Sequence, residues 1–350
     1  MKRLVLFFST ALLLAACSGG GPVDRAGDRV RGRPGAERDA GVAEAGTTVP
    51  PLVPVPTAPV QPAPLGARPR VLVKAEARAL ALHGANLIYG DTVEDGVFLV
   101  PKAGGEPKRI ARRSPTSRTF AIDGEEIAWV ASPGDAVLRA SLQSSAFPTT
   151  LRDRGIFADV AANRGDVFVS EALGGGGALF RITGPTAARL TAFDGAPRGL
   201  LVDASHVFIV TATKILKTSH QKGDVETVAS GTHVEWPALA GDRIFYVAQP
   251  EGAHRRALFV VPKSGGTPTL VARDVRDAPI AVEGTDVFWF DGSRPQLRAA
   301  TIGDAQTPPR VVSEDPALAT PSSIAVDTAT VFVGTGSKEE GAVVAIARRP

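Results

Sequence analysis

The 350-residue chain is short of several residue types on which small folds and reactive sites depend. It has a single cysteine and five scattered histidines. An internal disulfide is therefore impossible, and a Cys/His zinc domain is excluded. The motifs His-Glu-x-x-His and Gly-x-Ser-x-Gly, the Walker phosphate loop and Asp-x-Asp calcium loops are also absent. We therefore expect neither a bound metal nor a cofactor.

Charge of one sign is not in excess either. The chain has 39 Lys and Arg residues against 36 Asp and Glu residues, and 37 basic residues remain if Lys2 and Arg3 are removed with a leader. No stripe of basic residues alternates with aromatic ones, so nucleic-acid binding has no support.

The first seventeen residues predict export. Lys2 and Arg3 precede an apolar stretch from Leu4 to Leu14, which is shorter than the roughly 20 residues of a membrane helix and typical of a secretory signal peptide. The following Leu-Ala-Ala-Cys resembles a bacterial lipobox, in which the peptide is cut before the cysteine and the cysteine is acylated. We therefore predict a signal peptide over 1–16 and lipidation of Cys17. The alternative is an ordinary secretory signal with an incidental cysteine.

The residues after Cys17 predict a tether. Residues 17–69 are rich in Pro, Gly and Ala, and proline removes amide donors and favours extended geometry. We expect this segment to be disordered. Ser18 lies where lipoproteins retained in the inner membrane often carry Asp, so the resemblance implies a lipid anchor in the outer membrane. The protein would then face the periplasm or the cell surface, and we expect it to be a monomer.

From residue 70 onward the chain repeats a three-residue apolar unit at intervals of about 40 residues. The copies are Leu87-Ile88-Tyr89, Ile127-Ala128-Trp129, Val167-Phe168-Val169, Val207-Phe208-Ile209, Ile244-Phe245-Tyr246, Val287-Phe288-Trp289 and Val331-Phe332-Val333. Successive strand side chains point to opposite faces, so a unit that is apolar throughout must be covered on both sides. This period and pattern predict an all-β fold over 70–350, a seven-bladed β-propeller of four-stranded antiparallel blades.

The segments around each unit predict the other strands. An inner strand such as Ile280–Gly284 precedes the unit, and a third strand such as Val97–Lys102 follows it. Paired glycines at 104–105 then supply the positive-φ residues of a two-residue hairpin before the outer strand. The seventh unit stops after three strands, so we expect residues 69–74 to supply the fourth and close the ring.

The Val-Pro-Lys-x-Gly-Gly-x-Pro core resembles the propeller repeats of bacterial envelope lipoproteins, notably those of GC-rich myxobacteria. The 30 Arg against 9 Lys residues fit such a genome. The resemblance covers residues 70–350 and implies the fold and the envelope address, but it assigns no activity.

One repeat column predicts a binding site. Nine residues before each apolar unit, the column contains Arg78, Arg118, Arg198 and Glu235, and Trp236 follows it. These residues would ring one mouth of the central channel, where guanidinium groups beside an aromatic ring suit a small anionic or sugar-like ligand or a peptide carboxylate. The alternative is that the arginines are separately solvated loop residues.

Two function classes follow from this prediction. The first is a membrane-anchored propeller lipoprotein that acts as a non-catalytic binding or scaffolding module for an unknown protein or small ligand. The alternative is a propeller enzyme, of the lyase or hydrolase type, with its active site at the channel mouth. An enzyme of that kind would need a histidine, such as His83 or His233, within hydrogen-bond reach of Glu235.

Overall fold

The computed structural model describes residues 66–144, 147–303, 307–336 and 340–348. The predicted signal peptide, Cys17 and the tether up to residue 65 lie outside these ranges. The described residues form 28 strands and one short 3-10 helix, η1 (Pro316–Ala319). None of the helical structure in these ranges is long and apolar enough to span a bilayer.

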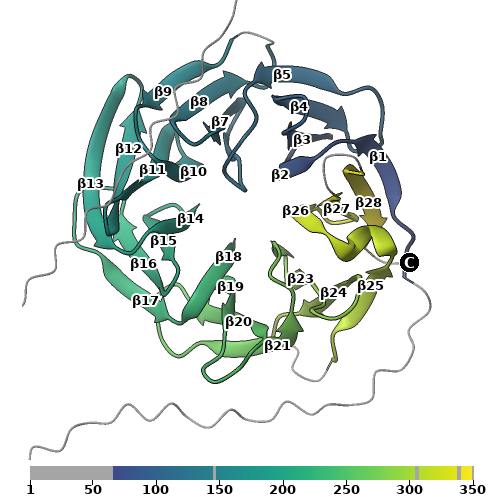
Figure 1. Ribbon diagram of the computed structural model, residues 1–350. Helices are drawn as coiled ribbons and strands as arrows, with labels where there is room; N and C mark the ends of the chain where they lie inside the picture. Colours follow the sequence, from purple (N-terminus) through teal and green to yellow (C-terminus); the bar gives the residue numbers. More distant parts are fainter. Residues whose placement is uncertain (1–65, 145–146, 304–306, 337–339, 349–350) are drawn as a thin grey trace, which may run out of the picture. The chain divides into compact units, whose positions relative to one another are not determined.

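The strands form seven antiparallel sheets of four strands, which are arranged as blades around a ring (Figure 1). Blades 1 and 2 contain β2 (Ala77–His83), β3 (Asn86–Asp91), β4 (Gly96–Pro101) and β5 (Lys108–Arg112), then β6 (Ala121–Asp123), β7 (Glu126–Ala131), β8 (Ala136–Ser141) and β9 (Thr149–Asp153). Blades 3 and 4 contain β10 (Phe157–Asn163), β11 (Asp166–Leu173), β12 (Gly176–Thr183) and β13 (Thr186–Asp194), then β14 (Pro197–Val202), β15 (His206–Thr211), β16 (Lys214–Ser219) and β17 (Glu226–Ser230).

The remaining three blades follow the same order from the ring centre outward. Blades 5 and 6 contain β18 (Thr232–Ala240), β19 (Arg243–Gln249), β20 (Arg256–Pro262) and β21 (Thr269–Val275), then β22 (Ala281–Glu283), β23 (Asp286–Phe290), β24 (Gln296–Thr301) and β25 (Arg310–Glu314). Blade 7 contains β26 (Pro321–Val326), β27 (Thr330–Thr335), β28 (Ala342–Ala347) and, as its outer strand, β1 (Arg70–Lys74). The predicted seven-bladed propeller is confirmed.

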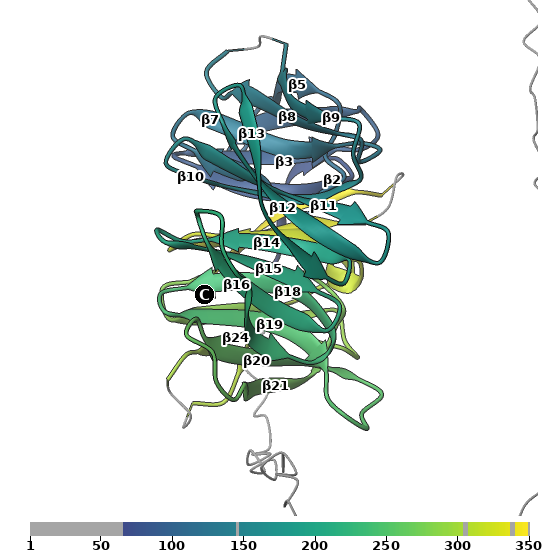
Figure 2. The same ribbon diagram turned by 90° about the vertical axis from the view of Figure 1, so that its left-hand side faces the viewer.

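The apolar units form the second strand of each blade, and every one of their side chains is buried. In β7 the two faces belong to different cores. Trp129 packs in a cluster with Ile88 of blade 1, whereas Ala128 packs in a cluster with Val167 and Val169 of blade 3. Each blade is therefore covered by both neighbours, which is why three consecutive positions are apolar. Figure 2 shows the sheets following one another around the ring in side view.

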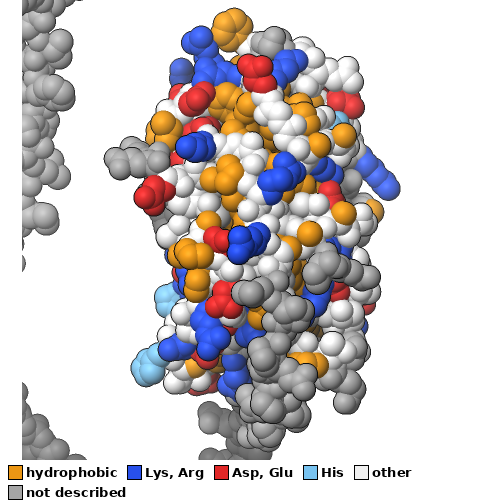
Figure 3. Space-filling view, turned by 90° about the vertical axis from the view of Figure 1, so that its right-hand side faces the viewer, with side chains coloured by type: hydrophobic (Ala, Val, Ile, Leu, Met, Phe, Trp, Pro, Cys, Tyr) orange, Lys and Arg blue, Asp and Glu red, His pale blue; other side chains and the backbone are white. Residues whose placement is uncertain are grey.

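The first strand closes the ring as the sequence predicts. β1 pairs antiparallel with β28, with Val71 opposite Val344 and Val73 opposite Val343. The chain just before β1 is also in contact with the propeller, because the Ser313 hydroxyl donates a 2.8 Å hydrogen bond to the carbonyl of Ala67. On this side of the ring, basic, acidic and apolar side chains are mixed (Figure 3).

The paired glycines adopt the predicted backbone but a different turn. Gly104 and Gly105 have φ angles of 94° and 141°, in the region that favours glycine. They lie in a six-residue connection, 102–107, between β4 and β5, so the prediction of a two-residue hairpin was wrong. Pro101 ends β4 and Pro107 is the last residue of the connection, and neither has the amide donor that would extend the ladder into it.

Candidate functional site

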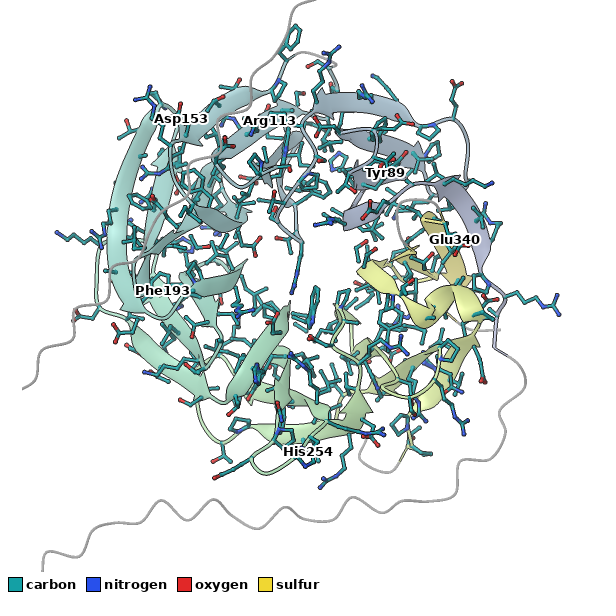
Figure 4. All side chains as sticks on the ribbon, viewed as in Figure 1. Tyr89, Arg113, Asp153, Phe193, His254 and Glu340 are labelled. Atoms are coloured by element: carbon teal, nitrogen blue, oxygen red, sulfur yellow. The ribbon has the colours of Figure 1, made fainter. Side chains whose placement is uncertain are left out.

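The predicted column lies where the innermost strands begin, and in four blades it coincides with a β-bulge. The register of β2, β10, β14 and β26 skips one residue near its start. The skipped residues are Arg78, Ala158, Arg198 and Ser322. A bulge leaves one residue out of the ladder and redirects its side chain, so a side chain at this position can project away from the start of the innermost strand. Figure 4 shows side chains directed toward the ring centre, while Asp153 and Phe193 of outer strands lie at the rim.

Glu235 of β18 is held between two arginines from other blades. Its Oε2 atom accepts a 2.9 Å hydrogen bond from Arg118, which precedes β6 in blade 2. Its Oε1 atom accepts a 2.7 Å hydrogen bond from Arg198 of β14 in blade 4. The Glu235 side chain is 9% exposed, whereas those of Arg118 and Arg198 are 51% and 46% exposed. One buried carboxylate thus fixes two half-exposed guanidinium groups at the ring centre.

Strand β18 is distorted on both sides of Glu235. Its register shifts between Thr232 and Glu235 and again between Glu235 and Ala238. His233 and Trp236 both have a φ of 52°. Left-handed backbone costs a side-chain-bearing residue roughly 1–2 kcal/mol, so it persists only where the surroundings impose it, and it concentrates at functional sites.

Trp236 is engaged on several sides. The Arg118 guanidinium lies over the indole, with its Cζ atom 3.8 Å from the ring centroid. The indole Nε1 donates a 2.8 Å hydrogen bond to Asp277, which forms a 2.7 Å ion pair with Arg256. Arg256 also donates to the carbonyl of His233 at 3.0 Å. The aromatic ring and the guanidinium are therefore parts of one polar network.

A second buried carboxylate, Asp159 of β10, ties together three blades. It accepts hydrogen bonds from the hydroxyl of Thr119 at 2.5 Å in blade 2 and from the amide of Leu200 at 2.9 Å in blade 4. Burial raises the pKa of Asp159 to about 6, against the lowering effect of these hydrogen bonds and of the Arg118 charge. Asp159 therefore gains or loses its proton in a mildly acidic range, under the influence of the Arg118 charge.

The structure brings together four of the five predicted site residues. These are Arg118, Arg198, Glu235 and Trp236. Arg78 is not joined to them in the described part of the chain; its side chain is 56% exposed and lies 3.7 Å from Glu76. The residues that sequence reasoning missed are Thr119, Asp159, Arg256 and Asp277. Asp159 had a weak signal, because it is the sole acidic residue in the column after the predicted one.

Neither histidine considered as an acid–base partner of Glu235 forms a hydrogen bond with it in the described part of the chain. His83 Nε2 is 3.2 Å from Glu125, whereas His233 lies in β18 two residues before Glu235 and joins the network through its backbone carbonyl. Among the described residues there is also no group of three or more His, Cys, Asp or Glu side chains placed to hold a metal ion.

No protein-family model and no curated protein matches this sequence. Among solved structures, the β-propeller domain of Cps50 (Swd1) from Myceliophteria thermophila is similar, with a TM-score of 0.60 and 14% identity over 81% of this chain and 100% of that domain. Oligogalacturonate lyase from Vibrio parahaemolyticus has a TM-score of 0.58 at 10% identity, over 81% of this chain and 90% of the lyase. The AfRom2 CNH domain has a TM-score of 0.55 at 11% identity, over 80% and 98%. At such identities these likenesses show the β-propeller fold and assign no function.

Proposed function

We propose that this protein is a lipid-anchored β-propeller of the bacterial envelope that binds a partner at its ring centre and does no chemistry there. The anchor rests on the sequence Leu14-Ala15-Ala16-Cys17. The binding role rests on the network around Glu235. The proposed location of the protein in the outer membrane rests on Ser18, which follows the proposed acylation site Cys17.

The observation that carries the binding role is the state of Glu235. Both of its carboxylate oxygens accept hydrogen bonds from arginines, and its side chain is 9% exposed. A general acid or base must reach the proton that it transfers, and a largely buried carboxylate whose two oxygens already accept from guanidinium groups is poorly placed to do so. The exposed groups are the guanidiniums of Arg118 and Arg198, which bind but do not transfer protons.

The enzyme alternative has little to build on at this position. It requires a histidine beside Glu235, whereas His83 pairs with Glu125. His233 contributes its backbone carbonyl to Arg256. The likeness to oligogalacturonate lyase, at 10% identity, carries over the fold and not the reaction.

Anchoring is tested on the full chain expressed in a Gram-negative host. Mass spectrometry of the N-terminal peptide should find cleavage before Cys17 and a mass increase from acyl chains. Cys17→Ala should release the protein into the soluble fraction, because membrane attachment would depend on these chains. An uncleaved or unacylated Cys17 would contradict the anchor without affecting the binding proposal.

Partner binding is tested with a photo-crosslinking residue at one of two exposed apolar positions. Ile156 is 71% exposed and lies in the connection that leads into β10. This connection is on the face of the ring at which the innermost strands begin, as are Arg118 and Arg198. Phe147 is 87% exposed and lies between β8 and β9. It is on the opposite face of the ring, because successive connections in an antiparallel blade alternate between the two ends of its strands. We expect a discrete crosslinked species from position 156, lost with Arg118→Ala, and none from position 147. Equal crosslinking at both positions, or none at either, would contradict the binding of a protein partner at the ring centre.

A further inference from the structure

The exposed groups at the ring centre are guanidiniums, and their spacing is fixed. Arg118 and Arg198 bond to the two oxygens of the same carboxylate, so the two guanidinium groups are neighbours although their blades are not. Each guanidinium has five N–H donors in a rigid fork. Within the described residues, Glu235 is the hydrogen-bond partner recorded for each, and about half of each side chain faces solvent. Further donors of both forks are therefore open to a ligand.

The charge of the network suits a single negative charge. Arg118, Arg198 and Arg256 carry three positive charges, and Glu235 and Asp277 carry two negative ones. Asp159, which lies close enough to feel the Arg118 charge, adds a third negative charge when it is ionised, so the network has one positive charge left over only while Asp159 holds its proton. A carboxylate brings one negative charge and matches the guanidinium fork through two parallel hydrogen bonds.

The indole of Trp236 is poorly placed to stack on a sugar. The Arg118 guanidinium lies over the ring at 3.8 Å, and the ring also packs against the core cluster that contains Phe245 and Trp289. The indole instead positions Arg118 by a cation–π contact. Neutral saccharides, which depend on an open aromatic face, are therefore disfavoured relative to anionic ligands.

We propose that Arg118 and Arg198, held side by side by Glu235 and with Arg118 supported by Trp236, form a site that binds the carboxylate group of a ligand. This inference rests on the proposed function, because it specifies what the ring centre recognises. The carboxylate can come from an acidic sugar or from the C-terminus of a peptide, and both present the same chemistry. Arg78 occupies the same repeat column but is not part of the site.

The test measures dissociation constants by ligand-observed NMR on the full chain in mild detergent. The probes are acetate, digalacturonate and acetyl-trialanine. The matched neutral compounds are acetamide, cellobiose and the acetyl-trialanine amide. We expect the acids to bind and their neutral counterparts not to bind. Tighter binding of digalacturonate than of the peptide would identify a sugar as the source of the carboxylate, and the reverse order would identify a peptide.

The variants Arg118→Ala and Arg198→Ala should each weaken carboxylate binding by about tenfold or more, the effect of losing a charged hydrogen bond. Arg78→Ala is the matched control and should leave the affinity within about twofold, as screened surface charges do. Arg118→Lys keeps the charge but loses the fork, and should recover only part of the affinity. If an alanine variant does not fold, the lysine variants at 118 and 198 decide the outcome.

Equal loss of affinity in Arg78→Ala, or equal binding of acids and amides, would overturn the carboxylate site. This result is separate from the crosslinking test. A partner that crosslinks at position 156 while no carboxylate binds would sink this inference and leave the recognition role standing. Carboxylate binding without any crosslinked partner would support the site and contradict a protein partner.

Discussion

The Nζ atom of Lys102 lies 2.9 Å from Oδ2 of Asp327, so the Val-Pro-Lys segment of blade 1 is joined to the inner turn of blade 7. The second copy of the motif does the same, because Lys263 of blade 5 lies 2.5 Å from Asp203 of blade 4. Both aspartates also accept hydrogen bonds from backbone amides of their own turn. Asp327 accepts from Ala329 and Thr330, and Asp203 accepts from Ser205 and His206. The repeated lysine thus links each of these blades to the one before it.

Replacing these lysines should weaken the contact between blades. We expect Lys102→Met and Lys263→Met each to lower the free energy of unfolding by about 1 kcal/mol, the contribution of a partly buried charged hydrogen bond. The methionine keeps the apolar stem and removes the charge. Urea denaturation measures the change, and Lys108→Met on the exposed outer strand β5 is the control. A loss no greater than that of the control would show that the link contributes nothing to stability.

The same contact predicts acid sensitivity. Burial alone would raise the pKa of Asp203, but hydrogen bonds from Lys263 and from the amides of Ser205 and His206 outweigh it and hold the pKa well below its usual range. A carboxyl with a lowered folded pKa stabilises the fold above its unfolded pKa of about 4 and loses that contribution as the pH falls. The melting temperature should therefore fall between about pH 4 and pH 2, and less steeply in Lys263→Met. Parallel curves for the two proteins would contradict this origin of the acid sensitivity.

The propeller could be predicted from the sequence because its core is the same in every repeat. Units such as Val207-Phe208-Ile209 must be apolar on both faces, since every blade lies between two others. The contacts at the ring centre could not be predicted in this way. Arg118 and Glu235 are 117 residues apart, and they meet because a long side chain from blade 2 reaches blade 5. That meeting depends on rotamers and strand distortions that differ between repeats.

Asp159 should produce a stability profile of the opposite slope. Burial raises its folded pKa from 3.8 to about 6, so the folded state holds this proton more tightly than the unfolded state. Stability from this group is then complete below about pH 4, falls by up to about 3 kcal/mol as the pH rises to about 6, and is level above that. Asp159→Asn should remove this slope.

The measurement is the free energy of unfolding at intervals between pH 4 and 8. The relevant quantity is how the difference in unfolding free energy between wild type and variant changes with pH. The asparagine side chain has one acceptor oxygen fewer, so the hydrogen bond from the Leu200 amide is also lost, and this shifts the whole curve by a constant amount. A difference that does not change with pH would mean that Asp159 titrates normally.

The left-handed backbone of His233 offers a test of strain in β18. His233 has a φ of 52°, and its side chain is exposed. Its backbone carbonyl accepts a hydrogen bond from Arg256, and a substitution of the side chain would keep that bond. Glycine adopts this conformation freely, so His233→Gly should stabilise the fold by about 0.5–1 kcal/mol after the added flexibility of the unfolded chain is subtracted. His254→Gly, at an exposed position without a positive φ, should be neutral or destabilising. Equal effects of the two substitutions would contradict the presence of strain at residue 233.

Closure of the ring by β1 yields the largest expected effect. Removing residues 66–74 would leave the edge of β28 unpaired and uncover Val343, which packs with Leu72 and Val73. We expect a loss of more than about 4 kcal/mol and aggregation through the open edge, because an unpaired strand is a template for another chain. Deleting residues 20–60 shortens the chain by more but retains β1, and should leave the melting temperature unchanged. Because the two deletions differ in whether they remove β1, a similar loss in both would mean that the ring is stable without its closing strand.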